Sequence, residues 1–204
     1  SITGDFLSRN VFGLSPSLHF TMDYALPLYD YGWLLILGVA TGLLGAFYNK
    51  MTMTSLHLYD RISCLKSHQK VIIPLLISGI LGLYIPQVIG GGHVLVSYLN
   101  SENVVLSTLV ILLIVKFIFS LLSFGSGAPG GIFFPLLILG SLIGAIFGKL
   151  AIMLGVPEIY FMNFIIFAMA GFFAGIVRAP ITGIVLIAEM CGTLKLMLPI
   201  AADR

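Results

Sequence analysis

Two strongly apolar runs, Val104–Leu122 and Leu136–Leu154, are separated by a stretch dense in glycine and proline. Runs of this length can lie in the core of a bilayer, where an unpaired backbone group costs several kcal/mol. The stretch around the gap, Phe124–Leu139, reads FGSGAPGGIFFPLLIL, and its glycines and prolines break regular structure and expose the backbone. Irregular backbone at membrane depth is tolerated only where it is buried in protein or lines an aqueous cavity. The chain must therefore enclose this stretch.

The apolar run after the glycines is expected to begin a new helix near Ile132. The first N–H groups of a helix have no intrahelical acceptor and carry the positive end of the helix dipole. No Asp or Glu occurs from Phe124 through Pro157 to occupy that end. This pattern predicts an anion site at the helix start. The glycines taken alone also fit close packing between helices, which small residues permit in membrane bundles.

The composition is that of a polytopic, all-α integral membrane protein. Of 204 residues, 59% are hydrophobic and only 9% are charged, whereas soluble proteins average about a quarter charged. The formal net charge of +2 gives no reason to expect a nucleic-acid partner. The two cysteines, Cys64 and Cys191, have neither a disulfide framework nor metal-ligand spacing, and His93 has no partner ligands at such spacing. We therefore expect no metal site and no cofactor.

Hydropathy divides the chain into a series of membrane segments. Ser1–Val11 is expected to end a spanning helix, and Phe12–Gly32 to connect it to the next. The remaining expected helices are Trp33–Ile62, Val71–Ile85, Val104–Leu122, Leu136–Leu154, Glu158–Ala174 and the short Pro180–Glu189. The first of these exceeds a perpendicular span of about 20 residues and is expected to be tilted. Its Trp33 suits an interfacial anchor.

Basic residues predict which connections face the cytoplasm. Arg61, Lys66, His68 and Lys70 surround Cys64, whereas Phe12–Gly32 and Gln87–Asn103 contain no Lys or Arg. By the positive-inside tendency, Cys64 is cytoplasmic and the other two connections face outside. The alternation of spans is consistent with this assignment.

Several apolar segments are short or interrupted by Gly and Pro. This pattern is typical of broken-helix transporters built from inverted repeats. The chain lacks an initiator Met and ends inside an apolar segment. We therefore interpret residues 1–204 as a single transmembrane domain that forms most of one repeat of a larger transporter.

Two motifs resemble those of the CLC family of chloride channels and chloride/proton antiporters. The string GSGAPGGIFFP resembles the family's second-half selectivity filter, and its G-I-F-x-P element is matched by Gly131, Ile132, Phe133, Phe134 and Pro135. Further on, the R-A-P-x-T-G…E-M segment is matched by Arg178, Ala179, Pro180, Thr182, Gly183, Glu189 and Met190. The resemblance follows nearly the whole chain in order.

The resemblance implies a CLC-type bundle of tilted and broken helices, mostly the C-terminal inverted repeat, in a multi-pass protein of the cell membrane. It implies transport of chloride or a similar small anion, with or without protons, as an antiporter or a voltage-gated channel. The main-chain N–H groups of Ile132 and Phe133 would hold the anion, with chloride as transported ligand and no cofactor. It also implies a homodimer in the lipid bilayer, with contacts from Ser1–Val11 and Ile181–Leu198.

The sequence departs from the family pattern in three places. The first-half G-S-G-x-P serine, the G-R-E-G-P glutamate and a late tyrosine have no match, and Ser126 belongs to the second-half motif. Channel and proton-coupled exchange therefore both stay open. Two alternatives also stay open: the fluoride-exporting branch of the family and an unrelated broken-helix transporter of an anionic solute.

Three of the charges within or beside the apolar segments are candidates for function: Lys116, Arg178 and Glu189. Charged side chains in membranes usually pair with one another, and they often mark ion pathways. Each of the three is a candidate for the ion path or for structural pairing.

An enzymatic interpretation was considered for Ser126. An intramembrane serine protease needs a histidine base within hydrogen-bond reach of its nucleophile. The four histidines, His19, His57, His68 and His93, all lie in or beside connections. We therefore expect no enzyme.

Overall fold

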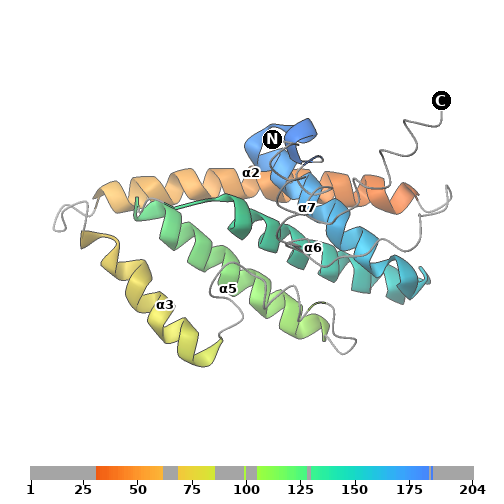
Figure 1. The fold of residues 1–204 in the computed structure, drawn as a ribbon, viewed down its shortest axis with the longest axis horizontal. Coiled ribbons are helices and arrows are strands. Elements are labelled where there is room, and N and C mark those ends of the chain that lie inside the picture. The colour runs from red at the N-terminus through yellow and green to blue at the C-terminus, as the bar shows by residue number, and fades with distance from the viewer. Residues whose placement is uncertain are drawn as a thin grey trace, which may run out of the picture.

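The computed structural model describes residues 31–61, 69–85, 99, 105–127, 130–183 and 185. Within those ranges the protein is all-helical, as predicted (Figure 1). The elements are α2 (Tyr31–Arg61), α3 (Ile72–Tyr84), α5 (Leu106–Gly125), α6 (Phe133–Met153), the 3-10 turn η4 (Glu158–Tyr160) and α7 (Phe161–Val177). Among them, α2, α5, α6 and the η4–α7 unit are long and apolar enough to cross a membrane, while α3 is shorter.

Helix α2 is the longest element, with 31 residues. It is about 46 Å long at 1.5 Å per residue, against about 30 Å for the hydrocarbon core, so the predicted excess length is confirmed. The helix begins at Tyr31, two residues before the predicted start, because Tyr31 and Gly32 join its first turn. Its buried side chains recur at helical spacing along one face: Leu37, Thr41, Tyr48, Ser55 and Tyr59.

Helices α6 and α7 approach closely at three successive turns of α6, with backbone against backbone at two of them. A Cβ atom added to Gly140 would lie 2.7 Å from the Cα of Met169, and one added to Gly144 would lie 2.6 Å from the Cα of Ile165. At Gly148 the added atom would lie 2.9 Å from the ring of Phe161. The order of these contacts makes the two helices antiparallel. Only glycine permits such an approach, which is a common device in membrane bundles.

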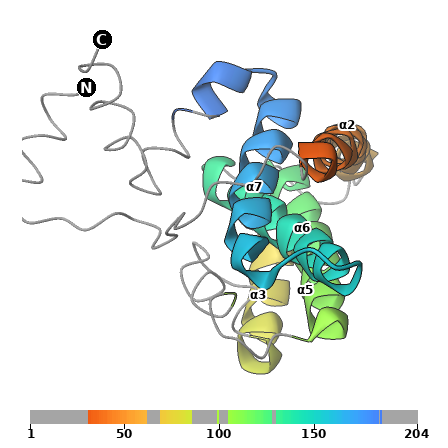
Figure 2. The same ribbon diagram turned by 90° about the vertical axis from the view of Figure 1, so that its right-hand side faces the viewer.

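Helix α6 is the centre of the bundle. Its residues from Leu136 through Ala145 are all buried. Figure 2 shows α6 with α7, α2 and α5 around it. The core joins α5, α6 and α7 through side chains such as Leu109, Leu112, Leu139, Leu142, Ile165, Met169 and Phe172. The run from Leu136 through Ala145 is thus enclosed by protein, whereas Gly127 and Gly130–Ile132 of the glycine-rich stretch before it are exposed within this chain.

Two helices extend past their predicted C-terminal ends. Helix α5 continues through Gly125, beyond the predicted end at Leu122, because the missing side chain of Gly125 lets the helix pack against Ser55 and Tyr59. Helix α7 continues through Gly175 to Val177, beyond the predicted end at Ala174. A Cβ atom on Gly175 would lie 3.6 Å from the Cα of Gly42. Glycine therefore serves helix packing at both positions.

Several sequence-based predictions lie outside the described residues. They concern Ser1–Val11, the connection Phe12–Gly32 up to residue 30, Cys64, Glu189 and almost all of Gln87–Asn103. Of the predicted helix Pro180–Glu189, residues 180–183 and 185 are described, and they are helical.

Candidate anion site at the start of α6

The chain turns sharply between α5 and α6. The N–H of Ser126 donates to the carbonyl of Leu122 at 3.2 Å, and the N–H of Gly127 donates to that of Phe124 at 3.1 Å. Gly127 has a φ of 72°, which glycine adopts without steric cost. The glycine-rich stretch therefore reverses the chain at the end of α5.

Helix α6 begins where the sequence predicted. Ile132 is the N-cap residue, with φ −81° and ψ −16°, and its carbonyl accepts the first helical hydrogen bond from Leu136 at 3.2 Å. The cap has no side-chain hydrogen bond, and the first turn contains no acidic residue. Pro135 in that turn has no N–H to donate. The donors available at this helix start are therefore few and defined.

The N–H groups of Ile132 and Phe133 have no backbone acceptor among the described residues. Gly130 and Gly131 before them are exposed, and Ile132 is 48% exposed, whereas every residue from Leu136 through Ala145 is buried. The positive end of the α6 dipole is thus accessible from one side and closed by protein on the other.

The start of α6 lies part-way along the bundle. Figure 1 shows the chain running back from the end of α5 toward the middle of the molecule before α6 begins. There the ring of Phe133 makes edge-to-face contacts with Phe173 of α7 at 5.3 Å and with Phe134 at 5.5 Å between centroids. The start of α6 therefore lies beside the middle of the bundle and not at one of its ends.

The end of α7 packs against α2 near Asn49. The side-chain amide of Asn49 on α2 donates to the carbonyl of Ile176 at 3.2 Å, one residue before α7 ends. Arg178 then adopts a left-handed conformation, with φ 58°, and its N–H donates to the carbonyl of Ala174 at 2.9 Å. Its side chain is exposed. A cation at this position complements the negative end of the α7 dipole.

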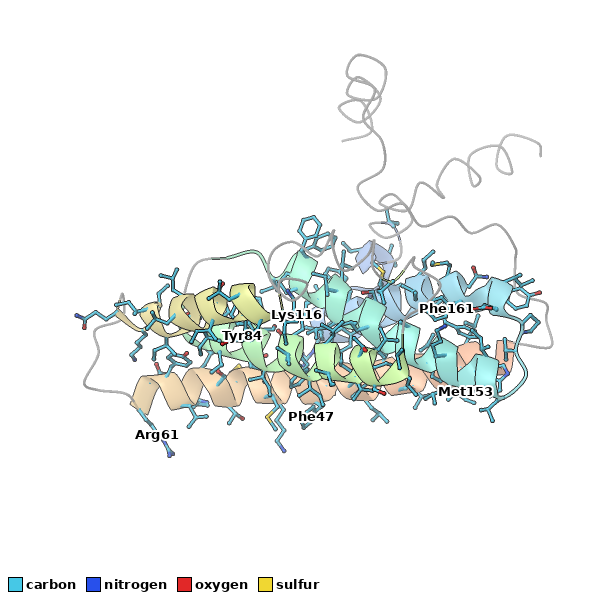
Figure 3. The ribbon with its side chains drawn as sticks, turned by 90° about the horizontal axis from the view of Figure 1, so that it is seen from below. Phe47, Arg61, Tyr84, Lys116, Met153 and Phe161 are labelled. Atoms are coloured by element: carbon cyan, nitrogen blue, oxygen red, sulfur yellow. The ribbon has the colours of Figure 1, made fainter. Side chains whose placement is uncertain are left out.

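Lys116 lies within the bundle, on the buried face of α5 together with Leu109, Leu112 and Ser120. Figure 3 shows it among the packed helices. Its side chain is only 4% exposed, and it is engaged in an interaction within the protein. The third candidate charge, Glu189, lies outside the described residues.

Ser126 is placed at the end of α5 and away from any described histidine base. Its hydroxyl donates to the carbonyl of Ser123 at 2.7 Å, and its side chain is buried. His57, the histidine that the structure describes, is exposed on α2. The geometry of the described residues gives Ser126 a helix-end role.

Two polar pairs of the structure were not anticipated from the sequence. The hydroxyls of Tyr48 on α2 and Ser120 on α5 are hydrogen-bonded inside the bundle. At the turn between α6 and α7, the ammonium of Lys149 lies 3.9 Å from a carboxylate oxygen of Glu158 and 5.3 Å from the ring centre of Phe161. The glycine spacing of α6 at positions 140, 144 and 148 was a readable signal of the α6–α7 contact; the Tyr48–Ser120 pair had none.

Comparison with known proteins agrees with this geometry. The sequence profile described as "Voltage gated chloride channel" matches residues 1–202. The H(+)/Cl(-) exchange transporter ClcA of Vibrio parahaemolyticus is 39% identical over 183 residues, which cover 87% of this chain and 39% of that protein. ClcA of Klebsiella pneumoniae is 40% identical over 174 residues, which cover 82% of this chain and 36% of that protein.

A solved structure shares the fold. The crystal structure of a slow cyanobacterial Cl−/H+ antiporter matches with a TM-score of 0.83 at 29% identity, covering 93% of this chain and 45% of that one. The chain thus spans less than half the length of the relatives that it matches.

The fold and the interrupted α5–α6 pair define an integral, multi-pass membrane protein with broken helices. The chain belongs to the voltage-gated chloride channel family, the CLC family that its filter sequence resembles. The matched relatives are named as exchange transporters or antiporters of H+ and Cl−, and the matched profile as a chloride channel.

Proposed function

We propose that this chain forms most of the second repeat of a transporter that moves chloride, or a similar small monovalent anion, across the cell membrane. The relatives named above are exchange transporters for H+ and Cl−, and this favours proton-coupled exchange over passive flow. A channel and the fluoride-exporting branch are the two alternatives, and an assay of anion and proton flux separates them from chloride/proton exchange.

One observation carries the proposal: α6 begins inside the bundle with accessible N–H donors and no acidic side chain in its first turn. The N–H groups of Ile132 and Phe133 hold the anion, and Gly131 lets the ion approach the backbone closely. Pro135 fixes the first turn without competing as a donor. Phe134 borders this region with a side chain that is 38% exposed.

Neutral donors suit an ion that must also leave. Main-chain N–H groups and a helix dipole attract a monovalent anion without a fixed counter-charge, so binding is weak enough for release. We assign Lys116 a supporting role, in which its buried charge raises the potential felt by the anion from a distance. Arg178 has a structural role at the end of α7.

We further propose that the protein is a homodimer with a separate pore in each subunit. Ile181 and Val185, at the start of the segment after α7, are 77% and 47% exposed and apolar. They supply part of the contact, together with Ser1–Val11. Tryptophans at Val185 and Met197 should yield monomers that still transport, since association in lipid rests on shape. Loss of flux on dissociation would place the pore at the subunit interface.

Anomalous diffraction from bromide-soaked crystals of the complete protein tests the site. We expect a bromide peak within about 3.5 Å of the nitrogens of both Ile132 and Phe133, slightly beyond the N–H···O range because the ion is larger. A peak found only beside Lys116 or Arg178 would overturn the helix-terminus mechanism. In vesicles, chloride efflux that drives proton uptake supports exchange, uncoupled efflux supports a channel, and selective fluoride efflux supports the fluoride branch.

A further inference from the structure

The side of α2 opposite its buried face is divided into two zones. At helical spacing this side first presents exposed apolar residues, which are Leu35, Val39, Leu43 and Phe47. The same stripe then continues with exposed polar and basic residues, which are Lys50, Thr54, His57 and Arg61. Figure 3 shows Arg61 on the side of α2 that faces away from the other helices. Phe47 borders this side, because its half-exposed ring also stacks on Phe117 of α5 at 5.9 Å between centroids. We call these eight residues the outer stripe of α2.

The change from apolar to basic falls at the expected edge of the hydrocarbon. Trp33, whose ring contacts Phe147 at 6.2 Å, suits the interface at the other end of the helix. The 17 residues from Trp33 to Lys50 rise about 25 Å, close to the hydrocarbon thickness of about 30 Å. The long Lys50 side chain can cover the remaining distance and place its ammonium among the headgroups.

The cations of the outer stripe are available for a ligand. Within the described ranges, Lys50, His57 and Arg61 form no ion pair, and the hydroxyl of Thr54 donates to the carbonyl of Lys50 at 2.9 Å. Asp60 is exposed next to Arg61, but it is turned about 100° around the helix from it. The stripe therefore has a net positive end at the cytoplasmic edge of the membrane.

We propose that the outer stripe binds an anionic phospholipid of the cytoplasmic leaflet. The phosphate of this lipid lies at Lys50, and its acyl chains lie along Leu43, Val39 and Leu35. His57 and Arg61 attract the phosphate from the aqueous side. The positive charges of Lys50 and Arg61 complement the negative charge of the phosphate. Basic clusters at the cytoplasmic edge of membrane helices attract anionic lipids in this way. The inference does not depend on which ion the protein carries.

Native mass spectrometry of the complete protein tests the charge requirement. We expect tighter retention of dioleoyl phosphatidylglycerol than of dioleoyl phosphatidylcholine, and a roughly five-fold weaker affinity for the anionic lipid in Lys50→Gln. Lys149→Gln is the matched control, because it removes one cation from a membrane helix at a site paired with Glu158. Equal retention of the two lipids, or an equal loss in both variants, would overturn the proposal.

A second measurement tests contact with acyl chains. Trp33 is the only tryptophan, so Leu43→Trp in a Trp33→Phe background places one fluorophore on the outer stripe. Lipids brominated on their acyl chains should quench it strongly in reconstituted vesicles. Absence of quenching would mean that protein covers this side of α2, and the lipid proposal would fail.

Discussion

The phenol of Tyr48 on α2 and the hydroxyl of Ser120 on α5 lie 2.5 Å apart inside the bundle. The ring of Tyr48 also contacts Phe117 of α5 and Phe172 of α7, at 5.4 Å and 6.0 Å between centroids. One side chain of α2 thus joins the helices on both sides of it.

Removing either hydroxyl should weaken the bundle. Tyr48→Phe and Ser120→Ala each leave a buried polar group without its partner, and we expect each to lower the free energy of unfolding by about 1 kcal/mol. The double variant should be little worse than either single one, because only one interaction is lost. Unfolding measured in bicelles gives the three values; additive losses would show that the two groups act independently.

Gly144→Ala should destabilise the α6–α7 contact. The new methyl group would lie within 2.6 Å of the Cα and 2.7 Å of the carbonyl oxygen of residues on α7, Ile165 and Phe164. Overpacking of this kind costs about 1–3 kcal/mol. Gly38→Ala on α2 is the control, since no atom lies within 4 Å of its added Cβ. Equal thermal stability of the two variants would contradict the contact.

Arg178→Gly should stabilise the protein relative to Arg178→Ala by about 1 kcal/mol, because glycine adopts a φ of 58° without the penalty of a side chain. Anion flux measured on the same variants separates two roles. A purely structural Arg178 predicts that the glycine variant transports normally; a stable glycine variant without flux would assign the charge to the ion path.

Ile132→Pro should weaken anion binding severely, whereas Ile132→Ala should have little effect. The φ of −81° at Ile132 suits proline, so this substitution removes the N–H with little change of backbone. Calorimetric titration of the complete protein with chloride compares the two. If alanine proved as harmful as proline, the N–H of Ile132 would not be what holds the anion.

Lys116→Met should slow anion flux about ten-fold while Lys116→Arg retains it. A unit charge acting over a distance on the order of 10 Å, at an effective dielectric constant of about 20, changes ion binding by about 1.7 kcal/mol. Efflux from chloride-loaded vesicles gives the rates, and the folded yield is measured in parallel. A methionine variant that fails to fold, with arginine tolerated, would instead assign Lys116 to structural pairing.

The sequence predicted the elements best where local chemistry decides them. The glycines and prolines around Ile132 fix where α6 can begin, and the helix start agrees with the prediction. Glycine was misread where tertiary contact decides its role. The helices continue through Gly175 and Gly125 because each of these glycines packs closely against another helix. The local sequence does not indicate which helix that neighbour is.

The candidate site was predictable only in part. Backbone donors at Ile132 and Phe133 follow from the helix start, which is a local property. The contacts that support the site, such as Phe133 with Phe173 and Asn49 with the carbonyl of Ile176, join segments distant in sequence. Such pairs depend on helix packing angles, which hydropathy and spacing do not determine.

The glycine contacts at positions 140, 144 and 148 have a mechanical consequence. With two backbone contacts and one ring contact over three turns, α6 can neither roll nor slide against α7 without collision, so the two helices form one rigid unit. The start of α6 is therefore fixed relative to α7. If the protein transports anions as we propose, access to this point must change through the movement of smaller parts, such as single side chains, while the α6–α7 pair keeps its geometry.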